Sequence, residues 1–289
     1  MRLILHLGAH ATDGGKVADW MSENRADFAE QGLCAPPPRA FLQALSAALL
    51  DQDTDPRLRE ETLLRSLGAS GARRWMSVSA AGLLGAQTDV ISSEGFYVKD
   101  MVRRLHALNA LFPRSTVTVL LSVRTASGIL PAMVAGNADA LANRMASLNM
   151  ATLPWAHVVR QIRRHMPRAQ VVVWRHEDFA TLWPRVLSVM SGPLDSVPSE
   201  GLLTFAANGL SAEGRVRLQR YCETNPQPTI GHLRRVVALF GTRYGKPPAL
   251  PETGHLPAWV RAEFARLDQG YDTELDDIAG QSGVTVLHP

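Results

Sequence analysis

Short apolar runs alternate with longer amphipathic segments over residues 1–190, and this order constrains the fold more than any other feature of the sequence. Strand-like runs are expected at 2–7, 89–92, 116–123 and 170–174, with helices between them. Strands that alternate with helices form a mainly parallel sheet flanked by helices. The run at 116–123 is apolar or β-branched nearly throughout, which predicts a central strand.

Helices in this first part are placed by apolar side chains at helical spacing. They are expected at 16–31, 40–50, 57–67, 97–111, 127–149, 154–165 and 177–190. Pro131 and Gly136 should distort the segment at 127–149, because proline removes a backbone donor and glycine is a weak helix former. The stretch 73–85 fits neither period clearly, and its structure stays open.

Helical periodicity dominates the remaining third of the chain. Helices are expected at 212–222, 231–240, 258–268 and 273–279, and a short strand at 284–287. A chain of 289 residues can form one large domain with its own core. We therefore expect a single α/β domain over residues 1–289, in which a βαβ sheet core at 1–190 carries a mostly helical extension at 191–289.

Composition and charge exclude several classes of protein. No apolar run approaches the length of about eighteen residues that a transmembrane helix needs, so no membrane span is expected. The net charge of +3 is mild and does not by itself indicate a nucleic-acid partner. The arginines are spread along the chain, apart from one local cluster that is interpreted as a solvated face at a helix end, formed by Arg160, Arg163, Arg164 and Arg168. Cys34 and Cys222 are interpreted as two buried thiols in a reducing cytoplasm. No cysteine or histidine cluster has the spacing of a metal site.

A glycine-bearing turn lies between the first expected strand and the first expected helix, with the sequence HLGAHATDGGK over residues 6–16. Backbone N–H groups and the positive end of the helix dipole converge in such a turn, which makes it a site for phosphate and other anions. A nucleotide-triphosphate P-loop would need glycine at position 10 and a hydroxyl residue at position 17. These residues are His10 and Val17, so that motif is absent.

The turn and four later segments resemble bacterial sulfotransferases of the P-loop superfamily, whose first strand leads into Gly-Ala-x-Lys-Thr-Gly-Thr-Thr. Residues 91–94 (Ile-Ser-Ser-Glu) look like the family strand that ends in Ser-Ser-Glu, and residues 119–124 like its strand that ends in arginine. Residues 171–179 look like its strand that ends in a basic residue, Glu-Asp and an aromatic, and 271–275 like a late helix that follows a tyrosine. The order of these segments implies a three-layer P-loop-type fold.

Such enzymes transfer a sulfonate from 3′-phosphoadenosine 5′-phosphosulfate to a hydroxyl or amine acceptor. The resemblance implies that a loop lysine and loop hydroxyls bind the 5′-phosphate and the sulfonate. It also implies that an arginine, with a serine eight residues later, holds the 3′-phosphate. Gly8, Thr12 and Arg124 match these positions, but the serine position is Ala132.

The loop itself departs from the family pattern where the chemistry is most demanding. The lysine position is Ala11, and the following glycine is Asp13, whose carboxylate would repel a phosphate. Gly14 and Gly15 stand at the two hydroxyl positions. Loss of a cation that stabilises developing charge costs about 3–4 kcal/mol, which is two to three decades in rate. We therefore expect the parent chemistry to be weak or absent unless other groups substitute.

Nearby residues are candidates for that substitution. Lys16 lies one helical turn inside the loop, His10 can donate to an anion, and Ser127 follows the arginine by three residues. Their structural alternatives are a solvated lysine, a hydrogen-bonded loop histidine and an N-cap serine. Glu94 is the candidate acid or base, with pairing to an arginine as its alternative. The cluster 176–178 (His-Glu-Asp) is interpreted as a strand end followed by a helix cap.

The candidate catalytic set is therefore Glu94, His10 and Lys16, with no metal ligand. The candidate cofactor-binding set is Gly8, Thr12, Gly14, Gly15, Lys16, Arg124 and Ser127. Three hypotheses for the function stay open. The chain is a sulfotransferase with a small-molecule or glycan acceptor, an inactive pseudoenzyme that acts as a binding protein, or a phosphate-handling enzyme that uses Lys16 and Glu94. The sequence indicates no oligomeric state.

Overall fold

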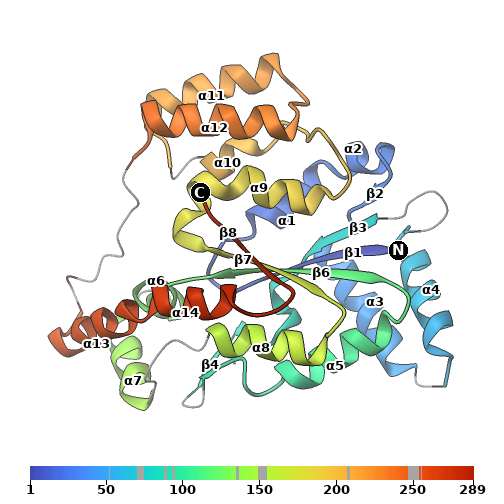
Figure 1. Ribbon diagram of the computed structural model, residues 1–289, viewed down its shortest axis with the longest axis horizontal. Coiled ribbons are helices and arrows are strands. Elements are labelled where there is room, and N and C mark those ends of the chain that lie inside the picture. The colour runs from blue at the N-terminus through green and yellow to red at the C-terminus, as the bar shows by residue number, and fades with distance from the viewer. Residues whose placement is uncertain are drawn as a thin grey trace.

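Figure 1 shows the computed structural model of the chain. It describes residues 1–51, 53–69, 75–87, 90–92, 95–134, 137–148, 155–206, 209–246, 254 and 256–289. The strands are β1 (Arg2–Gly8), β2 (Leu33–Cys34), β3 (Trp75–Ser79), β4 (Ile91–Ser92), β5 (Gly95–Phe96), β6 (Thr116–Val123), β7 (Gln170–Arg175) and β8 (Val284–Leu287).

Helices occupy much of the remaining described chain. The first seven are α1 (Lys16–Glu23), α2 (Arg25–Glu30), α3 (Pro38–Leu50), α4 (Pro56–Ser66), α5 (Met101–Leu111), α6 (Ala126–Met133) and α7 (Ala138–Ser147). The others are α8 (Trp155–His165), α9 (Phe179–Ser191), α10 (Leu202–Ala206), α11 (Ala212–Thr224), α12 (Ile230–Tyr244), α13 (Ala258–Gln269) and α14 (Tyr271–Ala279), with 3₁₀ turns at Ala81–Leu83 and His176–Asp178. Among the described helices, none is both long and apolar enough to cross a bilayer.

Six strands form one parallel sheet in the order β2-β3-β1-β6-β7-β8 (Figure 1). The central pair is β1 and β6, in which Leu5 lies opposite Val119. On the other side of β6, Val119 lies opposite Val171 of β7. Because these strands are covered on both faces, both sets of their alternating side chains are mostly apolar. The central position expected for 116–123 is confirmed.

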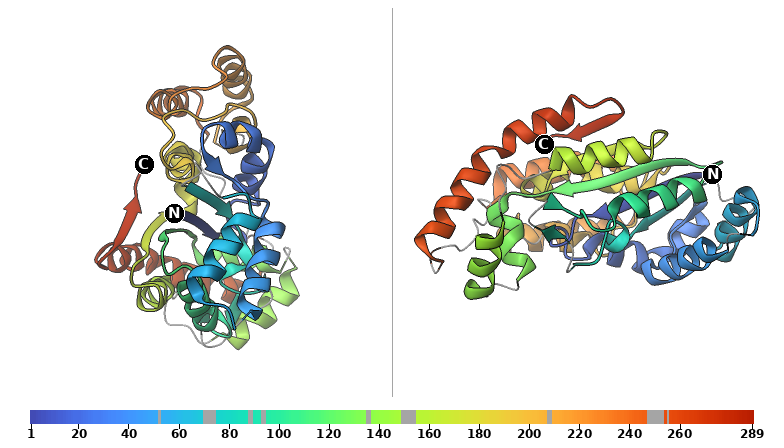
Figure 2. Two further views of the ribbon diagram at one scale, coloured as in Figure 1. Left: turned by 90° about the vertical axis from the view of Figure 1, so that its right-hand side faces the viewer. Right: turned by 90° about the horizontal axis from the view of Figure 1, so that it is seen from below.

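Two hydrophobic cores lie on the two faces of the sheet, beneath the helices that Figure 2 shows on either side of the strands. Leu3, Leu5 and Leu7 of β1 point to the face that carries α3 to α8. Ile4 points to the opposite face, where α1, α2 and α9 pack with a cluster of buried tryptophan and phenylalanine side chains. The chain is therefore α/β with three layers, as expected.

The C-terminal third contributes to both faces of the sheet. Helices α13 and α14 place Phe264 and Tyr271 in the core beside α6 and α8. Helices α11 and α12 add Leu218 and Leu233 to the other core and form an outer layer over α9 and α10 (Figure 1). Strand β8 pairs with β7, so the strand expected at 284–287 is confirmed and belongs to the same sheet.

Two of the expected helices need correction, and the stretch left open at 73–85 can be assigned. The helix expected at 16–31 is broken at Asn24, whose side-chain nitrogen donates to the carbonyl oxygens of Trp20 at 2.8 Å and Glu200 at 3.2 Å. The segment expected at 127–149 forms two helices, α6 and α7. The undecided stretch 73–85 contains β3, whose fully buried Ser77 hydroxyl contacts the sulfur atoms of Met21 and Met190.

The strand expected at 89–92 also differs from its assignment to the parallel sheet. Ile91 and Ser92 pair with β5 in a two-stranded antiparallel hairpin outside the main sheet. In the main sheet, β1 has β6 on one side and β3 on the other. The Ser92 hydroxyl donates to the carbonyl oxygen of Gly95 at 3.3 Å, which closes the hairpin locally.

Replacement of a central side chain should show how much the sheet depends on its packing. Leu121 of β6 is fully buried, so Leu121→Ala should reduce the free energy of unfolding by about 2–5 kcal/mol. Leu50 at the end of α3 is 83% exposed, and Leu50→Ala should change it by less than about 0.5 kcal/mol. Urea unfolding measures both, and equal losses would contradict the placement of β6 in the core.

Candidate functional site

The carboxyl edge of the sheet has a topological switch point between β1 and β6. The chain leaves β1 toward β2 on one side and leaves β6 toward β7 on the other. In open α/β sheets, ligands bind outside the carboxyl ends of such a pair, where the two following loops diverge. Here the two loops are joined, because the Arg124 guanidinium after β6 donates a hydrogen bond to the carbonyl oxygen of Ala11 after β1.

Side chains of the β1–α1 loop bind its own backbone. The Thr12 hydroxyl donates to the carbonyl oxygen of Ala9 at 2.6 Å. Asp13 Oδ2 accepts a hydrogen bond from the backbone N–H of Val17 at 3.1 Å. The first turn of a helix leaves its N–H groups without backbone partners, and these groups would bind an anionic ligand. The Asp13 carboxylate therefore takes the place of such a ligand at the start of α1.

The same loop has left-handed backbone at four positions, with φ of 71° at Gly8, 60° at Ala11, 65° at Gly14 and 84° at Gly15. Glycine adopts this conformation without steric cost, whereas alanine pays about 1–2 kcal/mol. The hydrogen bond from Arg124 to the Ala11 carbonyl is charge-assisted and offsets a cost of that size.

Both the side chain and the backbone of Arg124 make hydrogen bonds to neighbouring segments. Burial lowers the pKa of its guanidinium, and the nearby carboxylate of Glu177 opposes that shift. The indole N–H of Trp155 donates to the backbone carbonyl of Arg124 at 2.8 Å and fixes the end of β6. Arg124, to which the resemblance assigns a 3′-phosphate, thus lies at the carboxyl edge of the sheet with a guanidinium nitrogen bound to the loop.

Glu177 holds the segment after β6 in place. Its Oε1 accepts hydrogen bonds from the backbone N–H and the hydroxyl of Thr125, both at 3.0 Å. Its Oε2 accepts from the hydroxyl of Tyr271 at 3.1 Å. Burial raises the pKa of Tyr271, and the carboxylate adds to the shift. One side chain thereby joins the ends of β6 and β7 to the start of α14.

Asp268 of α13 occupies the N-terminus of α6. Its Oδ1 accepts from the backbone N–H of Ala126 at 2.7 Å and more weakly from that of Ser127 at 3.4 Å. Its Oδ2 accepts from the Ser127 hydroxyl at 2.5 Å. The serine that was expected to reach a phosphate is therefore bound to a carboxylate of the protein, and its N-cap alternative is also wrong, because Thr125 is the N-cap residue.

His176 lies among the charged groups of this edge. Burial lowers the pKa of His176 to about 4, and the positive charge of Arg124 acts in the same direction. The carboxylates of Glu177 and Asp13 oppose the shift, whereas Lys16 adds to it. The imidazole is therefore neutral at pH 7. The sequence placed this residue at a strand end, and the 3₁₀ turn there agrees, although Asp178 makes no side-chain cap at the start of α9.

The candidate catalytic residues have different surroundings. The Tyr97 hydroxyl lies 3.1 Å from the backbone nitrogen of His10, which donates to it, and 3.2 Å from His10 Nδ1. This contact agrees with the structural alternative for the histidine, and burial raises the pKa of Tyr97 to about 12. The Lys16 ammonium makes no hydrogen bond or ion pair with the residues that the structure describes. Glu94 lies outside the described residues.

His6 is a buried polar residue that the sequence analysis did not single out. It lies on β1 directly beneath the loop, and its Nδ1 is 2.8 Å from the Ser79 hydroxyl. Its ring stacks on Trp174 of β7 with centroids 5.6 Å apart. Burial lowers the pKa of His6, and the Asp13 carboxylate opposes the shift. A histidine within an otherwise apolar strand was the available signal for this residue.

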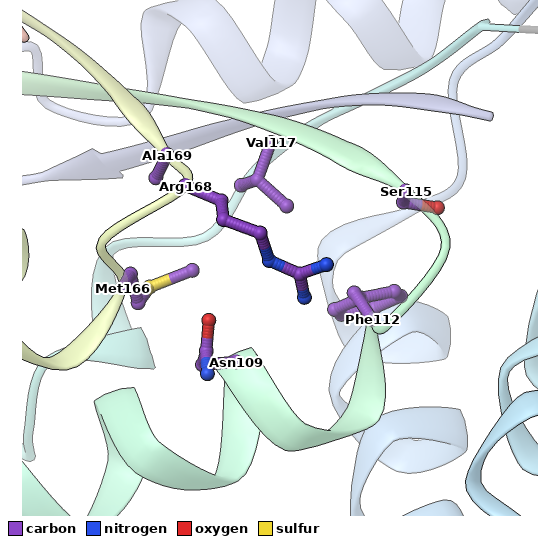
Figure 3. Close-up of a pocket in the computed structure, with 7 residues that line it drawn as sticks. All are labelled: Asn109, Phe112, Ser115, Val117, Met166, Arg168 and Ala169. Carbon is purple, nitrogen blue, oxygen red and sulfur yellow. The ribbon is translucent and has the colours of Figure 1, made fainter.

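A small hollow lies at the amino edge of the sheet, and Figure 3 shows the side chains that line it. Its lining residues are Asn109, Phe112, Ser115, Val117, Met166, Arg168 and Ala169. They surround the amino ends of β6 and β7, far from the loops that follow these strands. The Arg168 guanidinium donates to the carbonyl oxygen of Pro113 at 2.8 Å, so it braces this turn. The hollow is not part of the candidate site.

Comparison of the chain with protein-family models, with curated proteins and with solved structures finds no match in any of the three. The resemblance to sulfotransferases therefore stays a prediction from the motifs. Within the described ranges, no group of three or more His, Cys, Asp or Glu side chains is placed to hold a metal ion.

The low pKa of His176 predicts how the free energy of unfolding should change with pH. In the unfolded chain this imidazole binds a proton near its ordinary pKa of 6.5, but in the folded protein only near 4. Unfolding therefore takes up a proton between these values, and stability falls as the pH falls from 6.5 to 4. Over this pH range, the free energy of unfolding of His176→Gln should therefore fall less than that of the unchanged protein, by up to about 3 kcal/mol. Chemical unfolding at several pH values measures this, and parallel profiles for the two proteins would contradict it.

Proposed function

We propose that the protein is a sulfotransferase-like binding protein that does not transfer sulfonate. The single observation that carries this proposal is that the donors expected to hold the phosphates of the nucleotide already bind groups of the chain. Arg124 donates to the Ala11 carbonyl, and Ser127 donates to Asp268. The Asp13 carboxylate accepts a hydrogen bond from the backbone N–H of Val17 in the first turn of α1.

The residues present do not fit 3′-phosphoadenosine 5′-phosphosulfate. The nucleotide would have to displace Asp268 from α6, and it would meet the Asp13 carboxylate in the loop. No cation stands at position 11, where the family lysine acts on the developing charge of the leaving group. Because an uncompensated carboxylate repels phosphate and a missing cation slows transfer by about two to three decades, these features favour loss of the activity.

Active sulfonate transfer to a small-molecule or glycan acceptor is the second candidate, and one observation favours it. Lys16 and the neutral His176 lie close enough for Lys16 to lower the pKa of the histidine. A lysine cation and a neutral imidazole at one edge are the types of group that stabilise an anion and accept a proton. This arrangement would need Asp268 and Arg124 to give up their present hydrogen bonds.

Calorimetry with 3′-phosphoadenosine 5′-phosphate separates the two candidates. We expect the nucleotide to bind no more tightly than a Kd of about 1 mM, because it must compete with three hydrogen-bonded contacts within the protein. Micromolar binding that is lost in Arg124→Ala would overturn the proposal and support a working nucleotide site.

Restoring the family residues should restore affinity if the loop is aligned correctly. Ala11→Lys combined with Asp13→Gly adds a cation and removes the repelling carboxylate, so affinity for the same nucleotide should rise by about tenfold or more. Asp139→Gly with Ala140→Lys makes the same exchange on the exposed start of α7 and serves as the control. An equal response of the two double variants would mean that the loop is not the binding site.

A further inference from the structure

The hairpin of α11 and α12 carries a concentrated positive charge. Residues 212–246 contain six arginines and one lysine against two glutamates, a net charge of +5. The other 254 residues carry −2, since the whole chain carries +3. The mild overall charge therefore conceals a strongly basic element on a slightly acidic body.

This basic hairpin lies on the outside of the molecule. Figure 1 shows α11 and α12 as the layer farthest from the sheet on that face, and Figure 2 shows the pair end-on above α9. Helix α11 packs inward through Leu218 and Cys222, and α12 through Leu233 and Val237. The opposite sides of both helices face away from the protein, since residues about half a turn from the buried positions point outward.

The outward sides combine arginines with aliphatic side chains. Val216 and Arg220 are exposed on α11, four residues apart, and Arg235 and Leu239 have the same spacing on α12. Val216 is 66% exposed and Leu239 is 69% exposed, although both are apolar. The outward sides of the two adjacent helices therefore offer arginines together with an apolar side chain each, a combination that suits a partner with both anionic and apolar parts.

Three arginines of this hairpin have no carboxylate partner among the residues that the structure describes. Glu213 pairs with Arg217 at 3.0 Å. No carboxylate of the described residues forms an ion pair with Arg220, Arg234 or Arg235. Charge complementarity therefore calls for an anionic partner from outside the chain.

We propose that this hairpin docks the protein reversibly on a bilayer surface that contains anionic lipids. The arginines bind the headgroup phosphates, and Val216 and Leu239 enter the boundary between headgroups and acyl chains. Basic amphipathic helices with exposed aliphatic residues bind membranes in this way, whereas a nucleic-acid backbone supplies phosphates but no apolar layer. The observations therefore favour a lipid surface over a nucleic acid.

Sedimentation with phosphatidylcholine vesicles, with and without phosphatidylglycerol, tests the proposal on the full chain. Binding should require the anionic lipid and should fall steeply when salt is raised from about 0.05 M to about 0.5 M, because the Debye length shortens. Each arginine at such a surface contributes about fivefold to the partition coefficient. Arg220→Gln with Arg235→Gln should therefore weaken binding by about 25-fold, and Leu239→Ser should weaken it further.

The matched control lies on α4, where Arg57, Leu58 and Arg65 are exposed at the opposite side of the molecule. Arg57→Gln with Arg65→Gln makes the same change in net charge, and Leu58→Ser removes an aliphatic side chain that is 52% exposed. These variants should bind vesicles like the unchanged protein. Circular dichroism should show that all variants keep the fold, because every substituted residue is exposed.

Three results would overturn the proposal. The first is no binding to phosphatidylglycerol vesicles at low salt. The second is an equal loss in the α4 control, which would mean that net charge alone decides. The third is tighter binding of a duplex or single-stranded oligonucleotide than of the anionic vesicles, which would assign the surface to nucleic acid instead.

Discussion

Carboxylates that accept hydrogen bonds from backbone N–H groups hold the carboxyl edge of the sheet together. Asp13 accepts from an N–H in the first turn of α1, and Glu177 binds the segment after β6. Asp268, on a helix late in the chain, accepts from an N–H at the start of α6. Helix starts need such partners, because their first N–H groups have none within the helix. The relative positions of the loops, of Arg124 and of the buried Tyr271 all depend on these contacts.

This bonding pattern connects the departures in the loop with the rest of the molecule. An anionic ligand could bind here only if the N–H groups at the starts of α1 and α6 were free. Because Asp13 and Asp268 accept hydrogen bonds from those groups, a cation at position 11 would have no anionic ligand to stabilise. Ala11 offers its carbonyl to Arg124 instead, and Asp13 supplies a negative charge where the family has glycine. The loop residues Ala11 and Asp13 and the distant Asp268 therefore act in the same direction. Together they give the N–H groups and Arg124 partners within the protein, so that no bound anion is needed at this edge.

The sequence predicted those parts of the fold that local pattern determines, and missed those that depend on distant contacts. Strands β6, β7 and β8 were found because they are apolar or β-branched. Strand β3 was not, because Ser77 interrupts its apolar pattern and is buried against methionine sulfurs. The break at Asn24 depends on Glu200, and the cap by Asp268 joins residues more than a hundred positions apart. The resemblance to sulfotransferases implied a site role for Arg124, but the residues that Arg124 contacts could not be predicted from it.

Strand β8 completes the sheet long after its neighbour has been made. Between Arg175 at the end of β7 and Val284 at the start of β8 lie 108 residues, and the helices described among them lie on both faces of the sheet. At about 5–20 residues per second, the ribosome needs about 5–20 s to supply that strand. During this time β7 presents an open row of hydrogen-bonding groups beside apolar valines, the kind of edge on which nascent chains pair with one another. Biosynthesis of this protein therefore passes through a stage in which shielding by chaperones matters more than it does for the finished molecule.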